Sequence, residues 1–143
     1  NILTNHAFHN RKIKVLGGNQ LRPNIHIDDM VESYLTVLKA SPNKINGEIF
    51  NVGFKNQSVN ELAFDIKEVI GNDLEIIKTQ SNHNRSYHVS SKKIEEVLGF
   101  NTNKTVKNAV SDLKNAFEKD LLPNSMEDEK YFNIKRMQSI QLS

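Results

Sequence analysis

The stretch "SVNELAFDIKEVIGNDLEIIK", residues 58–78, carries the clearest structural signals in the chain. Ser58 followed by Glu61 three residues later is the capping-box pattern of a helix N-terminus, and Gly71 is typical of a helix end. Between them, apolar residues recur at helical spacing: Val59, Leu62, Ala63, Ile66, Val69 and Ile70. The run "LEIIK", residues 74–78, then predicts a short strand. A helix followed by a strand indicates a mixed α/β domain.

The residues before this stretch predict a helix, two strands and a second helix. Residues 1–10 have a loose helical spacing of apolar side chains. The run "RKIKVLGGN", residues 11–19, predicts a strand and then a turn at its two glycines, which adopt positive φ without steric cost. The run "NIHID", residues 24–28, alternates apolar and polar side chains, which predicts a second strand. Asp29 and Glu32 then repeat the capping-box pattern and predict a helix.

Two further runs predict strands. The run "EIFNVG", residues 48–53, crowds its apolar side chains as a strand buried on both faces does. After a polar loop over residues 79–84, "RSYHVS", residues 85–90, alternates again. These strands are too few and too far apart in the chain to build a self-contained doubly wound sheet. The architecture therefore lacks part of the sheet that such strands normally join.

The last third of the chain predicts helices. Ser90 or Ser91 precedes the helical run at residues 92–99, and Thr105 precedes a longer amphipathic run over residues 106–122. The tail, residues 124–143, mixes acidic, basic and apolar side chains, so we expect a docking segment or a frayed helix there.

Length and composition restrict the possible classes of protein. The 143 residues suit one domain, and their net charge of +2 is too small for the basic surface that nucleic-acid binding requires. The absence of cysteine excludes disulfides and thiolate chemistry. Apolar runs are too short to span a membrane, and the first residues do not have the pattern of a signal peptide. We therefore expect a cytoplasmic protein that binds neither nucleic acid nor membranes.

The common motifs of catalysis and cofactor binding are missing from the sequence. No glycine-rich GxGxxG follows a strand, so we expect no dinucleotide site in this chain. His6 and His9 have helical spacing, but no HExxH pattern accompanies them, and solvated histidines are the better interpretation. No serine lies in a GxSxG elbow. We therefore assign no catalytic, cofactor-binding or metal-binding residue.

The arginines are the remaining candidates for a binding site. The sequence has four, and both Arg22 and Arg85 lie at the entrance of a predicted strand. A guanidinium presents a planar fork of donors that matches two phosphate oxygens at once. Arg22 and Arg85 could form one such clamp, or each could be a solvated or ion-paired side chain at a strand edge. For Arg11 and Arg136 we expect only the second role.

Four segments taken together resemble a known family: "VLGGNQLRPNIHIDDMVESYLTVL" (15–38), "GEIFNVG" (47–53), "SVNELAFDIKEVIG" (58–71) and "NRSYHVSSKKIEEVLGF" (84–100). In this order and spacing they resemble the C-terminal half of the NAD-dependent epimerase/dehydratase family, the extended short-chain dehydrogenases/reductases that act on nucleotide sugars. The resemblance implies an α/β fold: a small, mixed helix-and-strand substrate-binding domain that lacks most of the Rossmann domain. Residues 1–143 would then be this single domain, with the tail at its end.

The resemblance also implies a set of substrate contacts. Arg22 and Arg85 match positions that typically contact the nucleotide diphosphate in this family. Asn1 resembles an asparagine that reaches toward the diphosphate or the sugar. Val15 lies in a strand, Lys14 to Leu16, that resembles the segment lining the nucleotide base. The implied site is therefore one for a nucleotide-sugar substrate.

The family's cofactor motif and catalytic residues belong to an N-terminal half with no counterpart in this sequence. The parent enzyme would use NAD or NADP to oxidise a sugar carbon while a tyrosine takes the hydroxyl proton, and this chain would supply only substrate positioning. We expect the missing half or self-association to cover its apolar faces. The alternative is a free-standing, non-catalytic binding or interaction module with the same fold.

Overall fold

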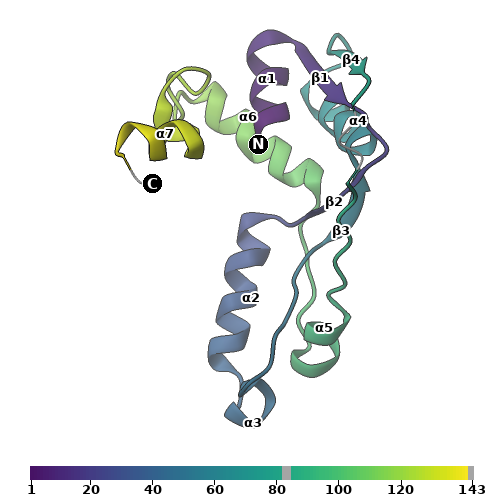
Figure 1. Cartoon of the computed structure of the whole chain (residues 1–143), viewed down its shortest axis with the longest axis vertical. Coiled ribbons are helices and arrows are strands. Elements are labelled where there is room, and N and C mark those ends of the chain that lie inside the picture. The colour runs from purple at the N-terminus through teal and green to yellow at the C-terminus, as the bar shows by residue number, and fades with distance from the viewer. Residues whose placement is uncertain (82–84, 142–143) are drawn as a thin grey trace.

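The computed structural model describes residues 1–81 and 85–141 and has a mixed α/β architecture (Figure 1). Residues 82–84 of the predicted loop and the last two residues of the predicted tail lie outside this range. The elements are, in chain order, α1 (Ile2–Asn10), β1 (Lys12–Leu16), β2 (Leu21–Asn24), α2 (Ile27–Lys39), α3 (Pro42–Ile45), β3 (Lys55–Ser58), α4 (Val59–Ile70), β4 (Glu75–Thr79), α5 (Lys92–Leu98), α6 (Val106–Glu118), the 3-10 helix η1 (Glu129–Tyr131) and α7 (Asn133–Ser139).

The strands pair in two separate two-stranded sheets. β1 and β4 are parallel, with Ile13 opposite Ile76. β2 and β3 are antiparallel, with Arg22 opposite Gln57. Parallel strands need a crossover connection, and α4 lies in the one that leads to β4. Within the described residues, neither sheet gains a third strand.

The hydrophobic core lies where α1, α4 and α6 pack against one another and against β1. Its buried apolar residues are Ala7, Ile13, Val15, Ala63, Ile66, Ile70, Leu74 and Val110. Full burial of one Val, Leu or Ile side chain contributes about 1.5–3 kcal/mol, so this cluster is a main source of stability. The helix predicted from residues 58–71 and the strand predicted after it are both confirmed and supply half of the cluster.

The N-caps of α4 and α6 form as the sequence predicts. Ser58 Oγ accepts the backbone N–H of Glu61 at 3.2 Å, and the Glu61 carboxylate accepts the backbone N–H of Ser58 at 2.7 Å. Thr105 and Asn108 make the equivalent reciprocal bonds at the start of α6. α6 ends at Glu118 rather than at residue 122, because the chain turns through a positive φ of 52° at Asp120.

The predicted strand at residues 24–28 and the predicted cap at Asp29 are wrong. The strand β2 lies earlier, and Ile27 already begins α2. His26 is the N-cap, because its Nδ1 accepts the backbone N–H of Asp28 at 3.1 Å. Asp29 is instead buried inside the first turn, where its carboxylate accepts the backbone N–H groups of Asn103 and Lys104. The alternating pattern of residues 24–28 is therefore a helix entrance.

The strand predicted at residues 48–53 is also wrong. This segment has no ladder partner, and the Ile49 side chain is 79% exposed. A strand needs a neighbouring edge to pair with, and the residues that the structure describes offer none at this position. The strand that does form nearby is β3. Its side chains are all polar, so it lacks the hydrophobic alternation from which strands are predicted.

Residues 85–90 run beside β2 and β3 as an extended segment without joining a sheet. The Tyr87 N–H donates to the Leu21 carbonyl at 3.1 Å, whereas Asn56 bonds both backbone groups of Val89 through its side chain. Side-chain bonds thus replace the ladder that the sequence predicted. Ser91 precedes α5 but does not cap it, because its hydroxyl bonds the backbone of Gly53.

The tail contains η1 and α7 and begins with a buried anchor. Ser125 is buried, and its carbonyl accepts the Asn5 side-chain N–H at 2.9 Å while its hydroxyl contacts Asn5 and His9. The tail therefore returns to α1. Its separate docking function stays a prediction.

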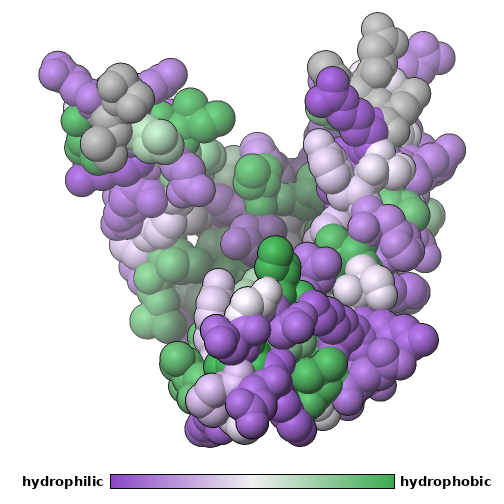
Figure 2. Space-filling model, turned by 60° about the horizontal axis from the view of Figure 1, so that its bottom comes forward, coloured by the Kyte–Doolittle hydropathy of each residue, from purple (hydrophilic) through white to green (hydrophobic). Residues whose placement is uncertain are grey.

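α2 leaves most of its apolar side chains in solvent. Ile27, Val31, Tyr34, Leu35 and Leu38 are all exposed. Figure 2, which brings this end of the molecule forward, shows hydrophobic residues interrupting an otherwise hydrophilic surface. No described helix has both the length and the apolar content of a membrane span.

Candidate functional site

A large open cavity of about 1150 Å³ runs along α6 and is lined by the start of α1, the end of β2, α4 and the tail. Its wall is mainly apolar. The apolar lining residues are Ile2, Leu3, Ile25, Phe54, Val59, Leu62, Ile66, Val106, Ala109, Val110, Leu113, Phe132 and Ile134. This volume slightly exceeds the usual range of about 300–1,000 Å³ for small-molecule sites, so the cavity can take a ligand as large as a nucleotide sugar.

The charged residues on the cavity wall are all basic. They are Arg22, Lys104 and Lys135, and none of the described lining residues is acidic. Lys104 also faces Asp28, with 3.6 Å between Nζ and the carboxylate. A concave surface with one sign of charge concentrates ligands of the opposite sign. The cavity therefore favours an anionic ligand.

Arg22 is held in place by its neighbours. Its Nη1 donates to the Leu21 carbonyl at 2.8 Å and to the Arg85 carbonyl at 2.6 Å. Its guanidinium carbon lies 5.3 Å from the centre of the Tyr87 ring. Both of these hydrogen bonds use Nη1, one of the three guanidinium nitrogens. Arg22 is thus oriented by backbone and ring contacts while its charge stays at the cavity.

The structure brings Arg85 to Arg22 through its backbone rather than through its side chain. The Arg85 carbonyl accepts from Arg22, whereas the Arg85 side chain is exposed and does not line the cavity. Arg11 and Arg136 lie elsewhere, in ion pairs with Asp73 and Glu129. The two-arginine clamp that the sequence suggested is therefore not assembled in this arrangement.

Asn1 and Val15 have different positions. Asn1 lines the cavity beside Ile2 and occupies the N-cap position of α1. Val15 is 0% exposed in the core and does not line the cavity. Its side chain offers no surface to a ligand, because β1 directs it into the packing with α1 and α4.

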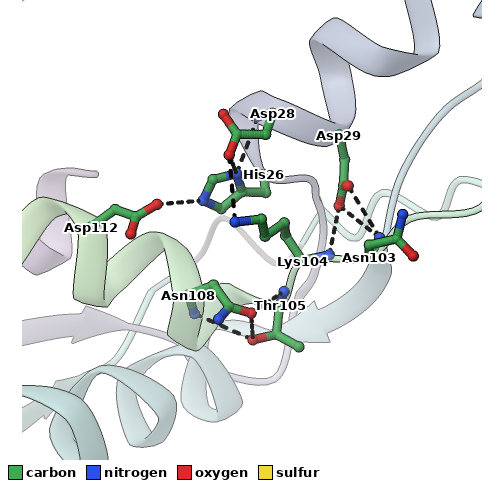
Figure 3. Close-up of polar contacts among 8 residues, drawn as sticks. All are labelled: His26, Asp28, Asp29, Asn103, Lys104, Thr105, Asn108 and Asp112. Atoms are coloured by element: carbon green, nitrogen blue, oxygen red, sulfur yellow. Dashed lines mark hydrogen bonds and ion pairs between the residues drawn. The ribbon is translucent and has the colours of Figure 1, made fainter.

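His26 forms a clasp between α2 and α6 at the edge of the cavity (Figure 3). Its Nδ1 accepts the Asp28 amide, so the ring proton is on Nε2, which donates to the Asp112 carboxylate at 3.0 Å. Asp29 adds a second tie, because it accepts the backbone N–H groups of Asn103 and Lys104. Together these bonds fix Lys104 next to the start of α6.

The ligand-capable atoms of His26, Asp28 and Asp112 lie within 4.8 Å of one another. Both ring nitrogens of His26 already have hydrogen-bond partners, and the Lys104 ammonium lies next to Asp28. Asp28 and Asp112 are also mostly exposed. The group therefore has the contacts of a structural clasp rather than those of a metal centre.

Sequence reasoning missed Lys104, Lys135, His26 and the tail aromatics. Lys104 directly precedes the predicted cap at Thr105, so the sequence alone could have indicated a cation beside the start of this helix. Lys135 follows Tyr131 and Phe132 in the tail, for which the sequence predicted a docking segment or a frayed helix. No local pattern indicates that this tail returns to the wall of a cavity.

Comparisons with known proteins found one family model that matches part of the sequence and a set of solved structures with a similar fold. A family model described as the NAD dependent epimerase/dehydratase family matches residues 1–53. The search of curated proteins found no match. The first two of the four resembling segments, at 15–38 and 47–53, lie within the matched residues, whereas the segments at 58–71 and 84–100 lie outside them.

Three of the solved structures with a similar fold show its range. L-threonine dehydrogenase from Clostridium difficile is 16% identical over 83% of this chain and 40% of its own length, with a TM-score of 0.71. UDP-glucose 4-epimerase from Thermotoga maritima, solved with UDP-glucose, is 23% identical over 84% of this chain and 39% of its own length, with a TM-score of 0.70. RMD from Pseudomonas aeruginosa, complexed with NADPH, is 18% identical over 77% of this chain and 37% of its own length, with a TM-score of 0.62.

These likenesses establish the fold. It is a mixed α/β fold that also occurs in a UDP-glucose 4-epimerase and in L-threonine dehydrogenases, as the sequence predicted. The chain spans about 40% of the length of those proteins. The family is described as NAD-dependent, and one of the neighbours was solved with NADPH.

Proposed function

We propose that this chain is the nucleotide-sugar-binding part of an NAD- or NADP-dependent epimerase or dehydratase and that it positions the substrate through its diphosphate. Arg22 is the observation that carries the proposal. Backbone carbonyls and Tyr87 fix its guanidinium at an apolar cavity whose charged lining residues are all basic. An oriented guanidinium fork is well suited to bind a phosphate.

Lys104 and Asn1 support Arg22 in this role. Lys104 is held beside the cavity by the bonds from its backbone to Asp29, and Asn1 lines the same wall. Arg85 contributes by positioning Arg22 through its carbonyl, and its exposed side chain is free to turn toward a bound diphosphate. Val15 makes no side-chain contact in this site, because it is buried in the core.

The chain's contribution to catalysis is binding energy. Contacts with the remote nucleotide hold the sugar at the reacting centre and so raise its effective concentration there. The cofactor, when bound by the parent enzyme, supplies the hydride chemistry. None of the cavity residues described above is assigned a catalytic step.

Titration calorimetry of the full chain with UDP-glucose tests this proposal. We expect Arg22→Lys to weaken binding by about 1.5–3 kcal/mol, because a lysine loses the bidentate geometry around the phosphate. Lys78→Gln, which removes one exposed cation from β4 away from the cavity, is the matched control and should have no effect. L-threonine serves as a second ligand, because threonine dehydrogenases share this fold.

Two results would contradict the proposal. Binding of UDP-glucose that is equally strong in wild type and Arg22→Lys would remove Arg22 from the site. Binding of L-threonine but not UDP-glucose would replace the nucleotide-sugar substrate by a small amino acid. If neither ligand binds, the alternative of a free-standing interaction module with this fold is the better description.

The exposed apolar face of α2 supports a partner for the chain. Ile49, in the segment at residues 48–53 that joins no sheet, is exposed as well, so both parts of the chain present hydrophobic side chains to solvent. We propose that a cofactor-binding half, or a second copy of the chain, covers this face. Size-exclusion chromatography with light scattering checks this, and a compact monomer that binds no hydrophobic dye would contradict it.

A further inference from the structure

The buried side chain of His26 lies between two carboxylates at the edge of the cavity (Figure 3). The ring is 2% exposed, with Nε2 3.0 Å from the Asp112 carboxylate on α6 and Nδ1 3.7 Å from the Asp28 carboxylate on α2. Histidine is the residue whose charge ordinarily changes between about pH 5 and 8. A change of charge at this position would therefore occur inside the protein and next to the ligand cavity.

The Asp28 carboxylate has two possible partners. One of its oxygens lies 3.6 Å from the Lys104 ammonium and 3.7 Å from His26 Nδ1. While the ring is neutral, Nδ1 accepts the backbone N–H of Asp28 and has no proton to give to the carboxylate. Lys104 is then the cation that faces this carboxylate. Because Lys104 also lines the cavity, Asp28 neutralises part of the charge that the cavity could offer to an anion.

Protonation of the ring changes these pairings. With a proton on both nitrogens, Nδ1 can no longer accept the Asp28 N–H and can donate to the Asp28 carboxylate instead, while Nε2 keeps its bond to Asp112. The charged ring then competes with Lys104 for Asp28, which releases the ammonium toward the cavity. Asp29 takes no part in this exchange, because its carboxylate accepts the backbone N–H groups of Asn103 and Lys104.

We infer that His26 is a proton-dependent positioning residue, whose protonation raises the affinity of the cavity for a phosphate-bearing ligand by releasing Lys104 from Asp28. Where that ligand is a nucleotide sugar, the inference rests on the proposed function. Arg22 keeps its position in both states, because its hydrogen bonds go to backbone carbonyls, which do not titrate. By linkage, a ligand that prefers the protonated form must take up part of a proton when it binds.

Titration calorimetry of the full chain tests this inference with two anions, UDP-glucose and sulfate. Both keep a constant charge over the range in which histidine titrates, so the ligand itself adds no pH dependence. Pairs of buffers that differ in ionisation enthalpy report the protons taken up on binding. We expect both anions to bind about fivefold more tightly at the acid end of this range than at the alkaline end, with uptake of protons between them.

Three variants separate the titration of the ring from its place in the fold. His26→Asn keeps a side-chain oxygen that can cap α2 but does not titrate, so it should remove both the proton uptake and the pH dependence. Lys104→Gln removes the cation that Asp28 would release and should remove most of the gain in affinity at acid pH. His88→Asn, at an exposed histidine outside the cavity, is the matched control and should behave as wild type.

Different outcomes would overturn different proposals. If His26→Asn weakens both anions by the same factor at every pH, the ring acts only through the fold, and the inference is wrong. If wild type binds UDP-glucose through Arg22 without proton uptake, the proposed function stands and the inference is again wrong. If sulfate binds with the expected pH dependence but UDP-glucose does not bind, the inference stands and the nucleotide-sugar proposal fails. If neither anion binds, both fail.

Discussion

The helices α2 and α4 have nearly the same length and are both amphipathic, but they bury opposite kinds of side chain. α4 buries Ala63, Ile66 and Ile70 in the core. α2 buries the polar Asp29 and Ser33 and leaves its apolar stripe in solvent. Amphipathicity therefore shows that a helix has a face to cover, but not that the same chain covers it.

The largest expected difference between these helices is in the free energy of unfolding. Ile66→Ala should cost about 2–5 kcal/mol because it opens a cavity in the core. Leu38→Ala on α2, where the side chain is 79% exposed, should change the free energy of unfolding by less than about 0.5 kcal/mol. Urea denaturation followed by circular dichroism measures both. A large, concentration-dependent cost of Leu38→Ala would show that α2 is already covered by a second copy.

A smaller effect is expected at the polar residue that α2 does bury. Asp29→Ala should cost about 1–3 kcal/mol, because it leaves the buried N–H groups of Asn103 and Lys104 without an acceptor. Glu32→Ala, which removes an exposed carboxylate one turn later, is the control and should be nearly neutral. Equal costs for the two variants would restore the capping-box interpretation of α2 and contradict the tie to residues 103–104.

Helix caps provide a third comparison. Ser58→Ala should destabilise the protein by about 1 kcal/mol, since the Ser58 hydroxyl accepts the Glu61 amide at the start of α4. Ser41 occupies the same position before α3 without a side-chain cap bond, so Ser41→Ala should have little effect. Thermal unfolding of both variants is the measurement. A cost at Ser41 as large as that at Ser58 would contradict the assigned role of the hydroxyl.

The smallest effect is the pH dependence of the Arg11–Asp73 pair at the end of α1. The side-chain hydrogen bond from Arg11 lowers the pKa of the exposed Asp73 carboxyl below its ordinary value. A lowered folded-state pKa stabilises the protein above the ordinary pKa, and this contribution is lost as the pH falls through the folded-state pKa. Asp73→Asn should therefore lower stability at neutral pH and converge with wild type in acid. Parallel stability curves at all pH values would contradict this.

Local signals were sufficient for much of the fold. The helix after Ser58, the strand after it and the helix after Thr105 are all specified by caps and apolar periodicity within the segments themselves. The strand predicted at residues 48–53 failed because a strand also needs an edge from elsewhere. β3 was missed for the opposite reason: it has a neighbouring edge, β2, to pair with, but its own sequence lacks hydrophobic alternation.

The candidate site was only partly visible in the sequence. Arg22 was identified from its residue type and its place at the entrance of a predicted strand, and the structure puts it on the cavity. The role of the Arg85 backbone, the burial of Val15 and the place of Lys135 on the cavity wall depend on packing between distant segments. Residue type predicts which groups could bind a phosphate, but tertiary packing decides which of them meet.

The parallel pairing of β1 with β4 also has a consequence for the order of folding. The hydrogen bonds of the sheet, and the Arg11–Asp73 contact across 62 positions, require a long loop to close before they contribute. The Asn5–Ser125 contact spans 120 positions, but the packing of α6 against α1 and α4 has already brought these ends together. The entropic cost of closing a loop grows slowly with its length, so the tail should dock late and at little further cost.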